Sequence, residues 1–209
     1  MRIASGSLVG RDDDLRAVLD SLRAQPAGRP GVVTVSGQAG IGKTRFVRAV
    51  ADRLRAEHGR VLTGACLDLR AGGSPYAAFI NAFRSSEPPA VHLLDALTGA
   101  VDMPRPRLLE LLRSTLVALA RTRPTVLVVE DLHWSDKITR DTLAWLLAMT
   151  REGRWTMIVT YRDDEVDARP AVREFLDVLD RGASVQVHLE PLAQSDVARQ
   201  VQDIVGAPV

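Results

Sequence analysis

Residues 37–44 read GQAGIGKT and match the pattern G-x-x-x-x-G-K-[ST] at every fixed position. The apolar run 31–36 (GVVTVS) precedes this segment directly, and residues 45–54 after it have apolar side chains at helical spacing. This order of strand, loop and helix predicts a phosphate-binding loop at a helix N-terminus, where backbone N–H groups and the helix dipole attract anions. The predicted ligand is a nucleoside triphosphate.

The residue types in this segment have separate predicted tasks. Glycine lets the backbone curl so that successive N–H groups point at phosphate oxygens. Lys43 is expected to reach the β and γ phosphates, and the Thr44 hydroxyl is expected to ligate Mg²⁺. Only two of the 27 basic residues are lysine, and one of them stands at this position. The predicted nucleotide-binding residues here are Gly37, Gln38, Ala39, Gly40, Ile41, Gly42, Lys43, Thr44 and Arg45.

Apolar runs alternate with helical patterns along the rest of the chain. Strands are predicted at residues 31–36, 61–66, 125–129, 155–161 and 184–189, and helices around 15–22, 45–54, 75–83, 107–121, 136–150, 170–179 and 195–205, with a weaker helical piece between 89 and 104. Such alternation predicts a parallel sheet covered by helices on both faces. We therefore expect an α/β fold, a three-layer α/β/α sandwich with a mainly parallel five-stranded sheet, within one domain.

Composition narrows the classes of function. The 209 residues carry a net charge of +1 with basic and acidic residues interspersed, so direct nucleic-acid binding by this segment is not indicated. The first residues lack the apolar core of a signal peptide, and no stretch is long and apolar enough for a membrane span, so a cytoplasmic location is expected and no membrane partner. The four histidines and the single cysteine share no ligand spacing, which argues against a zinc site.

Two carboxylates end the central apolar strand. If parallel strands end at the same sheet edge, Glu130 and Asp131 lie beside the phosphate-binding loop. One acid can hold the Mg²⁺ shell while the next orients and activates water. We expect Thr44 and Glu130 on the metal side and Asp131 at the attacking water.

Four segments together resemble a known family. They are residues 8–12 (LVGRD), 37–45, 126–136 (VLVVEDLHWSD) and 159–162 (VTYR). They look like the signal-transduction ATPases (STAND) of the AAA-related superfamily, whose fold is that of the P-loop NTPases. Within that group the chain resembles the ATPase module of large ATP-binding LuxR-family transcriptional regulators, and the resemblance covers residues 8–208.

The resemblance implies further site residues. Val9, Gly10 and Arg11 are implied to lie near the adenine, so that residues 1–30 form an adenine-side segment with a helix and residues 31–209 form the ATPase core. His133 and Trp134 are implied to shape the edge of the site, and Arg162 to sense the γ-phosphate. With Arg162 included, the predicted catalytic residues are Lys43, Glu130, Asp131 and Arg162. Family members often have Asp where this chain has Glu130, a longer side chain that alters metal geometry.

The resemblance also implies partners outside these residues. Such proteins continue into a helical lid, a winged helix, repeat sensors and a DNA-binding helix-turn-helix, and we expect the chain to end before the lid. Its partners would then be nucleotide with Mg²⁺ and either those C-terminal regulatory modules or a partner protein. Nucleotide-dependent self-association stays open.

The sequence leaves four candidate functions open. The leading hypothesis is a slowly hydrolysing ATP switch, in which the ATP and ADP states differ in conformation. The alternatives are a non-catalytic nucleotide-binding scaffold, an initiator-like or clamp-loader-like AAA ATPase acting on DNA, and a small-molecule kinase. The DNA hypothesis predicts a basic strip and a trans-acting arginine, for which Arg140, Arg173 and Arg181 are available; the kinase hypothesis predicts an Arg-rich lid that residues 163–209 do not offer.

The sequence also favours ATP over GTP. GTPases recognise guanine with an Asn-Lys-x-Asp motif. The single asparagine of this chain, Asn81, stands in a predicted helix, far from the place in the sequence where that motif would be expected. ATP or ADP with Mg²⁺ is therefore the predicted cofactor set.

Overall fold

The computed structural model describes residues 8–67, 75–84, 86–183 and 185–205. Five strands form one sheet: β1 (Gly31–Ser36), β2 (Arg60–Ala65), β3 (Thr125–Glu130), β4 (Trp155–Thr160) and β5 (Val185–His188). The strand order is β2-β3-β4-β1-β5, and every neighbouring pair is parallel. The predicted parallel five-stranded sheet is confirmed, with strand bounds within one residue of the predicted ones.

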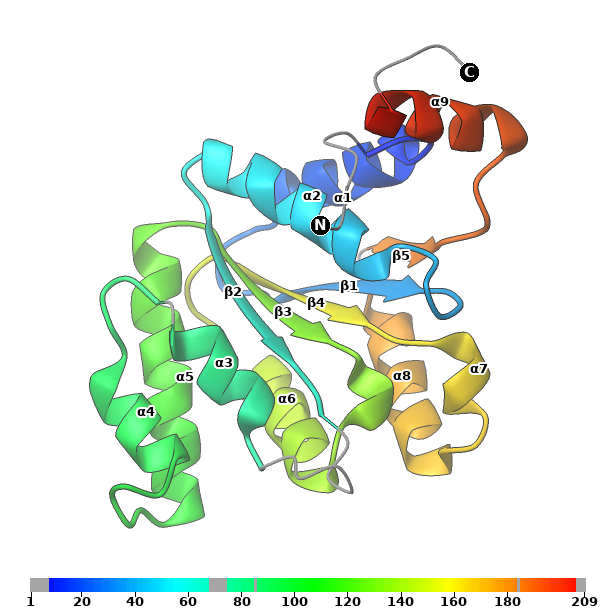
Figure 1. The fold of residues 1–209 in the computed structure, drawn as a ribbon. Coiled ribbons are helices and arrows are strands. Elements are labelled where there is room, and N and C mark those ends of the chain that lie inside the picture. The colour runs from blue at the N-terminus through cyan, green and yellow to red at the C-terminus, as the bar shows by residue number, and fades with distance from the viewer. Residues whose placement is uncertain (1–7, 68–74, 85, 184, 206–209) are drawn as a thin grey trace.

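Helices cover both faces of the sheet (Figure 1). One face carries α1 (Asp12–Ala24) and α2 (Lys43–Ala56), and the other carries α3 (Ala77–Arg84), α5 (Arg105–Thr122), α6 (Lys137–Met149) and α8 (Pro170–Gly182). The other helical segments among the described residues are α4 (Val91–Leu97), packed outside α5, the short helix α7 (Asp163–Val166), the 3₁₀ turn η2 (Leu132–Trp134) and α9 (Gln194–Val205). The three-layer α/β/α prediction is therefore confirmed. Ser74, predicted to open α3, lies outside the described residues, and α3 begins at Ala77.

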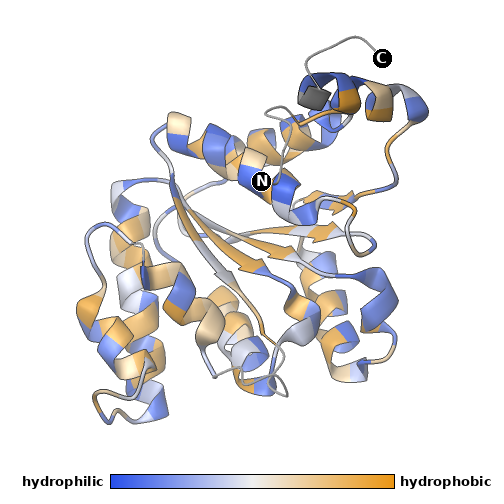
Figure 2. Cartoon of the chain, in the orientation of Figure 1, coloured by the Kyte–Doolittle hydropathy of each residue, from blue (hydrophilic) through white to orange (hydrophobic). Residues whose placement is uncertain are grey.

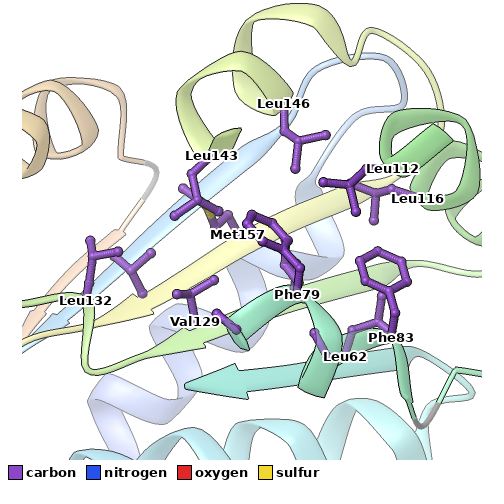
Figure 3. Packing of buried hydrophobic residues seen from close by; sticks show 14 of the residues in the cluster. Leu62, Phe79, Phe83, Leu112, Leu116, Val129, Leu132, Leu143, Leu146 and Met157 are labelled. Carbon is purple, nitrogen blue, oxygen red and sulfur yellow. The ribbon is translucent and has the colours of Figure 1, made fainter. Parts of the chain in front are cut away.

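Alternating strand residues build two separate hydrophobic cores. Val33 and Val35 of β1 pack with Phe46 and Val50 of α2, together with α1, in the first core. Residues of the opposite strand face pack against α3, α5, α6 and α8 in the second, larger core, part of which Figure 3 shows: Leu62, Phe79, Phe83, Leu112, Leu116, Val129, Leu132, Leu143, Leu146 and Met157. The period-two alternation of β-strands explains this division. Figure 2 shows the same pattern, with largely orange strands between helices whose outward faces carry most of the blue.

Gly64 allows α3 to approach β2 closely. A Cβ atom at Gly64 would lie 1.8 Å from the carbonyl oxygen of Ala78 in α3, so even alanine requires the helix to move. We expect Gly64→Ala to lower the free energy of unfolding by about 3 kcal/mol, at the upper end for overpacking, as measured by urea denaturation. Gly182→Ala is the control: nothing lies within 4 Å of that Cβ, and its effect should stay within about 1 kcal/mol. Equal stabilities for the two variants would contradict the close approach.

Candidate nucleotide-binding site

The glycine-rich loop (residues 37–44) leaves the carboxyl end of β1 and leads into α2. Gly37 has a φ of 143°, and a Cβ there would lie 2.8 Å from the carbonyl oxygen of Leu189. Gly42, with a φ of 106°, stands just before the first residue of α2 and has no side chain that could cap the helix. Gly42 thus leaves the start of α2 without a side-chain cap, and binding of an anion there stays a prediction.

Lys43 is the first residue of α2 and lies over the glycine-rich loop. Its Nζ donates hydrogen bonds to the carbonyl oxygens of Gly37 at 2.7 Å and Gln38 at 2.9 Å, and only 7% of the residue is exposed. Burial lowers the pKa of Lys43, and the nearby positive charge of Arg162 lowers it further. Two cationic side chains thus lie near each other at the loop, an arrangement that a phosphate would stabilise.

A hydrogen bond joins the glycine-rich loop to the acid-bearing strand. Thr44 Oγ1 donates to Glu130 Oε2 at 2.7 Å, although β4 lies between β1 and β3 in the sheet. A cavity of about 130 Å³ adjoins this pair and is also lined by Thr63, Arg48 and Arg55. The two predicted metal-side residues are therefore adjacent in the structure.

Asp131 follows β3 in the left-handed backbone conformation, with φ 55° and ψ 46°. Its backbone N–H donates to Thr160 Oγ1 of the neighbouring strand β4 at 3.0 Å, which fixes this turn. Aspartate adopts this conformation more readily than most residues, because its short polar side chain can bond locally. The side chain is 40% exposed at the same sheet edge as the loop. Its predicted role at the attacking water stays a prediction.

Arg162 follows β4, the strand between the loop strand and the acid strand. The next residues, Asp163–Val166, form the short helix α7. Arg162 Nη1 donates to Glu165 Oε1 at 2.5 Å, so the predicted γ-phosphate sensor is held by a carboxylate of α7. The strand order brings Arg162 near Lys43 and Asp131, but its sensing role is a prediction.

His133 and Trp134 lie in η2, beside these groups. The His133 side chain is fully buried, and among the described residues neither ring nitrogen has a hydrogen-bond partner. Arg169 donates from Nη1 to the His133 carbonyl oxygen at 3.0 Å, and its guanidinium lies 4.1 Å from the centre of the Trp134 ring. Trp134 packs half-buried against the larger core. The structure thus places both residues next to Asp131, and the role at the edge of the site that the resemblance implies stays a prediction.

The His133 ring gives the fold a specific pH dependence. Burial lowers the pKa of His133 from its ordinary value of 6.5, an effect that Asp131 and Glu165 partly oppose. Below pH 6.5 the unfolded state binds more protons than the folded state, so this histidine reduces stability as the pH falls and has no such effect at higher pH. We expect the free energy of unfolding to fall less steeply between pH 7 and 5.5 in His133→Gln than in wild type. The two slopes should differ by at most about 1.4 kcal/mol per pH unit, the contribution of one proton.

Urea denaturation at the two pH values measures this difference. His92→Gln, which changes an exposed histidine of α4, should keep the wild-type slope. A slope in His133→Gln equal to that of both other proteins would contradict the prediction.

A pocket of about 460 Å³ opens on the other side of the glycine-rich loop. It brings Val9 and Arg11 together with residues 40–42 and Arg45 of the loop and α2. That this pocket takes the adenine, as the resemblance implies, stays a prediction. Gly10 lies against α9, since a Cβ there would meet Asp196 Oδ2 at 2.5 Å. Arg11 also donates a hydrogen bond to the carbonyl oxygen of Glu190. The remaining lining residues are Leu8, Phe46, Pro191, Leu192, Val197 and Gln200.

Sequence reasoning missed the wall formed by Pro191, Leu192, Val197 and Gln200. These residues belong to α9 and the segment before it, which no motif marks. The only available signal is the amphipathic pattern of 195–205, which predicts a helix but not its position.

No group of three or more His, Cys, Asp and Glu side chains among the described residues could hold a metal ion. None of the helices in the same part of the chain has the length and apolar character needed to cross a membrane.

The parallel five-stranded sheet, with a glycine-rich loop between β1 and α2, defines a P-loop NTPase-like α/β fold. Residues 7–159 match the family model of the AAA ATPase domain. The chain belongs to the AAA ATPase domain family.

Relatives support this fold. The Aeropyrum pernix ORC2 protein, solved in ADPNP–ADP complexes, has a TM-score of 0.63 and 16% identity, and the match covers 97% of this chain and 53% of that one. A STAND protein with a tetratricopeptide repeat sensor, PH0952 from Pyrococcus horikoshii, has a TM-score of 0.53 and 17% identity over 100% of this chain and 28% of that one. An uncharacterized protein of Rhizobium meliloti, R02095, is 26% identical over 84% of this chain. The chain spans only 21% of that curated relative's length.

Proposed function

We propose that this chain binds ATP with Mg²⁺ and hydrolyses it slowly to ADP and phosphate, as the ATPase part of a signalling or transcriptional regulator. The observation that carries the proposal is the hydrogen bond between Thr44 and Glu130, which unites the glycine-rich loop with the acid-bearing strand. Lys43, Asp131 and Arg162 lie at the same carboxyl edge of the sheet, where ligands of α/β proteins bind. The ORC2 structure holds ADPNP and ADP on the same fold, which supports a nucleotide as the ligand.

The residues present fit Mg²⁺. Thr44 and Glu130 offer one hydroxyl and one carboxylate with oxygens 2.7 Å apart, and Mg²⁺ in nucleotide sites takes one or two protein ligands, the rest being phosphates and waters. The lack of a cluster of three metal-ligating side chains among the described residues agrees with this mode of binding. When bound, Mg²⁺ would neutralise charge on the phosphate oxygens.

Separate residues bind the phosphates, activate the water and hold the base in this proposal. The N–H groups at the start of α2 and Lys43 Nζ bind the β and γ phosphates, with Lys43 leaving the carbonyl oxygens of Gly37 and Gln38. Asp131 orients the attacking water in line with the γ-phosphorus, and its carboxylate accepts the water proton. Arg162 contacts the γ-phosphate, which distinguishes ATP from ADP. The 460 Å³ pocket between Val9 and Gln200 takes the base.

Phosphate release with wild-type protein tests the proposal. Purified protein is incubated with Mg-ATP, and binding of fluorescent ATP, ADP and GTP analogues is measured in parallel. Binding of ATP with slow phosphate release supports a hydrolytic switch. Nucleotide binding without release identifies a scaffold, and release that rises on adding duplex DNA identifies an initiator-like ATPase; either result contradicts the proposal.

A further inference from the structure

Arg162 is already paired in the structure. Its Nη1 donates to Glu165 Oε1 at 2.5 Å, and the Glu165 N–H donates back to the Arg162 carbonyl oxygen at 3.3 Å. Arg162 has an extended backbone just before α7, and Glu165 lies within that helix, so the pair joins the end of β4 to α7. The pair is partly shielded from water, with 34% of the Arg162 side chain and 23% of the Glu165 side chain exposed. A γ-phosphate that recruits Arg162 must therefore displace a carboxylate.

A second group faces the same carboxylate. Glu165 Oε2, the oxygen that does not bind Arg162 Nη1, lies 3.8 Å from Nε2 of His133. The His133 ring is fully buried, and both its nitrogens lack a hydrogen-bond partner in the part of the chain that the structure describes. A buried polar group without a partner costs about 1–3 kcal/mol. The part of this cost that arises at Nε2 disappears if Glu165 moves closer, with the neutral ring donating from Nε2.

Asp131 is the other carboxylate near this ring, with its Oδ1 4.0 Å from His133 Nε2. Its side chain is 40% exposed, whereas that of Glu165 is 23% exposed, so water solvates Asp131 better. Glu165 is also the carboxylate that would lose its partner when Arg162 turns to a phosphate. Glu165 therefore gains more from His133 than Asp131 does.

We propose that Glu165 competes with the γ-phosphate for Arg162, and that His133 receives the Glu165 carboxylate when ATP takes Arg162 away. This inference rests on the proposed function and deepens it, because it assigns the preference for ATP over ADP to a pair of positioning residues. ADP lacks the γ-phosphate and leaves the pair between Arg162 and Glu165 intact. The exchange rearranges hydrogen bonds and breaks no covalent bond.

The first test removes the competitor. Glu165→Gln keeps the shape of the side chain but weakens its interaction with Arg162. We therefore expect Mg-ATP to bind about five-fold tighter, a change that corresponds to the upper limit for a partly exposed ion pair, and Mg-ADP to bind with unchanged affinity. Glu110→Gln is the control, since Glu110 forms a similar pair with Arg113 three residues further along α5. It should leave both affinities unchanged. Arg162→Ala should remove the ATP preference and abolish the effect of Glu165→Gln.

The second test removes the receiving group. His133→Leu leaves the released carboxylate without a partner, so ATP affinity should fall about three-fold, the effect of one modest hydrogen bond, while ADP affinity stays unchanged. This effect should disappear in the Glu165→Gln background. His133→Gln, whose amide can donate a hydrogen bond, should keep a ratio near wild type. If circular dichroism shows that the leucine variant does not fold, His133→Met, which also lacks a donor, takes its place.

The outcomes distinguish failure of this inference from failure of the proposed function. Binding that depends on Lys43, with the same ratio of ATP to ADP affinity in wild type and Glu165→Gln, overturns this inference alone. Binding that is equal in wild type and Lys43→Ala overturns the proposed function, and this inference with it. Tighter binding of ATP alone in Glu165→Gln, lost in the double variant with Arg162→Ala, supports this inference and the ATP-binding part of the proposed function.

Discussion

Replacing Lys43 with alanine is expected to weaken Mg-ATP binding about 100-fold, which corresponds to the loss of about 3 kcal/mol from hydrogen bonds between an ammonium and phosphate oxygens. Lys43 lies over the glycine-rich loop with 7% of its surface exposed, and burial lowers its pKa. Its charge is poorly solvated in the free protein and gains most from an anionic ligand. The fold should persist, because the loop carbonyl oxygens that Lys43 contacts can bind water instead.

Titration of a fluorescent ATP analogue measures this loss. The chain supplies a matched control, since its other lysine, Lys137, is exposed and pairs with Asp141 on α6. Lys137→Ala should bind ATP as wild type does. If the two lysine variants bind equally, the glycine-rich loop is not the phosphate site.

Replacing Asp131 with asparagine is expected to slow phosphate release by a factor of about 10²–10⁴, the usual contribution of a general base, while ATP affinity stays within about two-fold. Asparagine accepts the left-handed conformation of residue 131 as readily as aspartate does. The backbone hydrogen bond to Thr160 does not depend on the side chain and should remain. The change therefore removes the proton acceptor without disturbing the turn.

Steady-state phosphate release and analogue binding, measured side by side, separate the two effects. Asp52→Asn on the exposed surface of α2 is the control, and it should affect neither quantity. Unchanged turnover in Asp131→Asn would exclude its role as base. Normal binding with lost turnover in Glu130→Gln would then move that role to Glu130.

Much of the fold could be predicted because burial on both faces leaves a simple pattern. Residues 126–129 are apolar throughout and lie in β3, between two helical layers. The loop of residues 37–44 could be predicted with its flanking strand and helix because glycine and lysine have few substitutes at those positions. The order of the strands, which places β4 between β1 and β3, has no local signal.

Contacts between distant segments could not be predicted. Thr160 of β4 accepts a hydrogen bond from the backbone of Asp131 at the end of the neighbouring strand β3. No sequence motif near residue 160 indicates this contact. The short helix α7 has three acidic residues among its four, a composition equally typical of a turn, so the pairing of Glu165 with Arg162 was hidden. The base-side wall near Leu192 arises only because α9 lies beside residues 8–11.

The 460 Å³ pocket has walls from residues 8–11 and from residues 191–200, the two extremes of the described chain. A nucleotide bound there would act as a reversible crosslink between segments separated by most of the sequence. Because Arg11 and Glu190 already touch, the ligand would close this polypeptide loop at little entropic cost. Occupancy of the pocket would thus govern the mobility of both segments together, independently of the chemistry at the γ-phosphate.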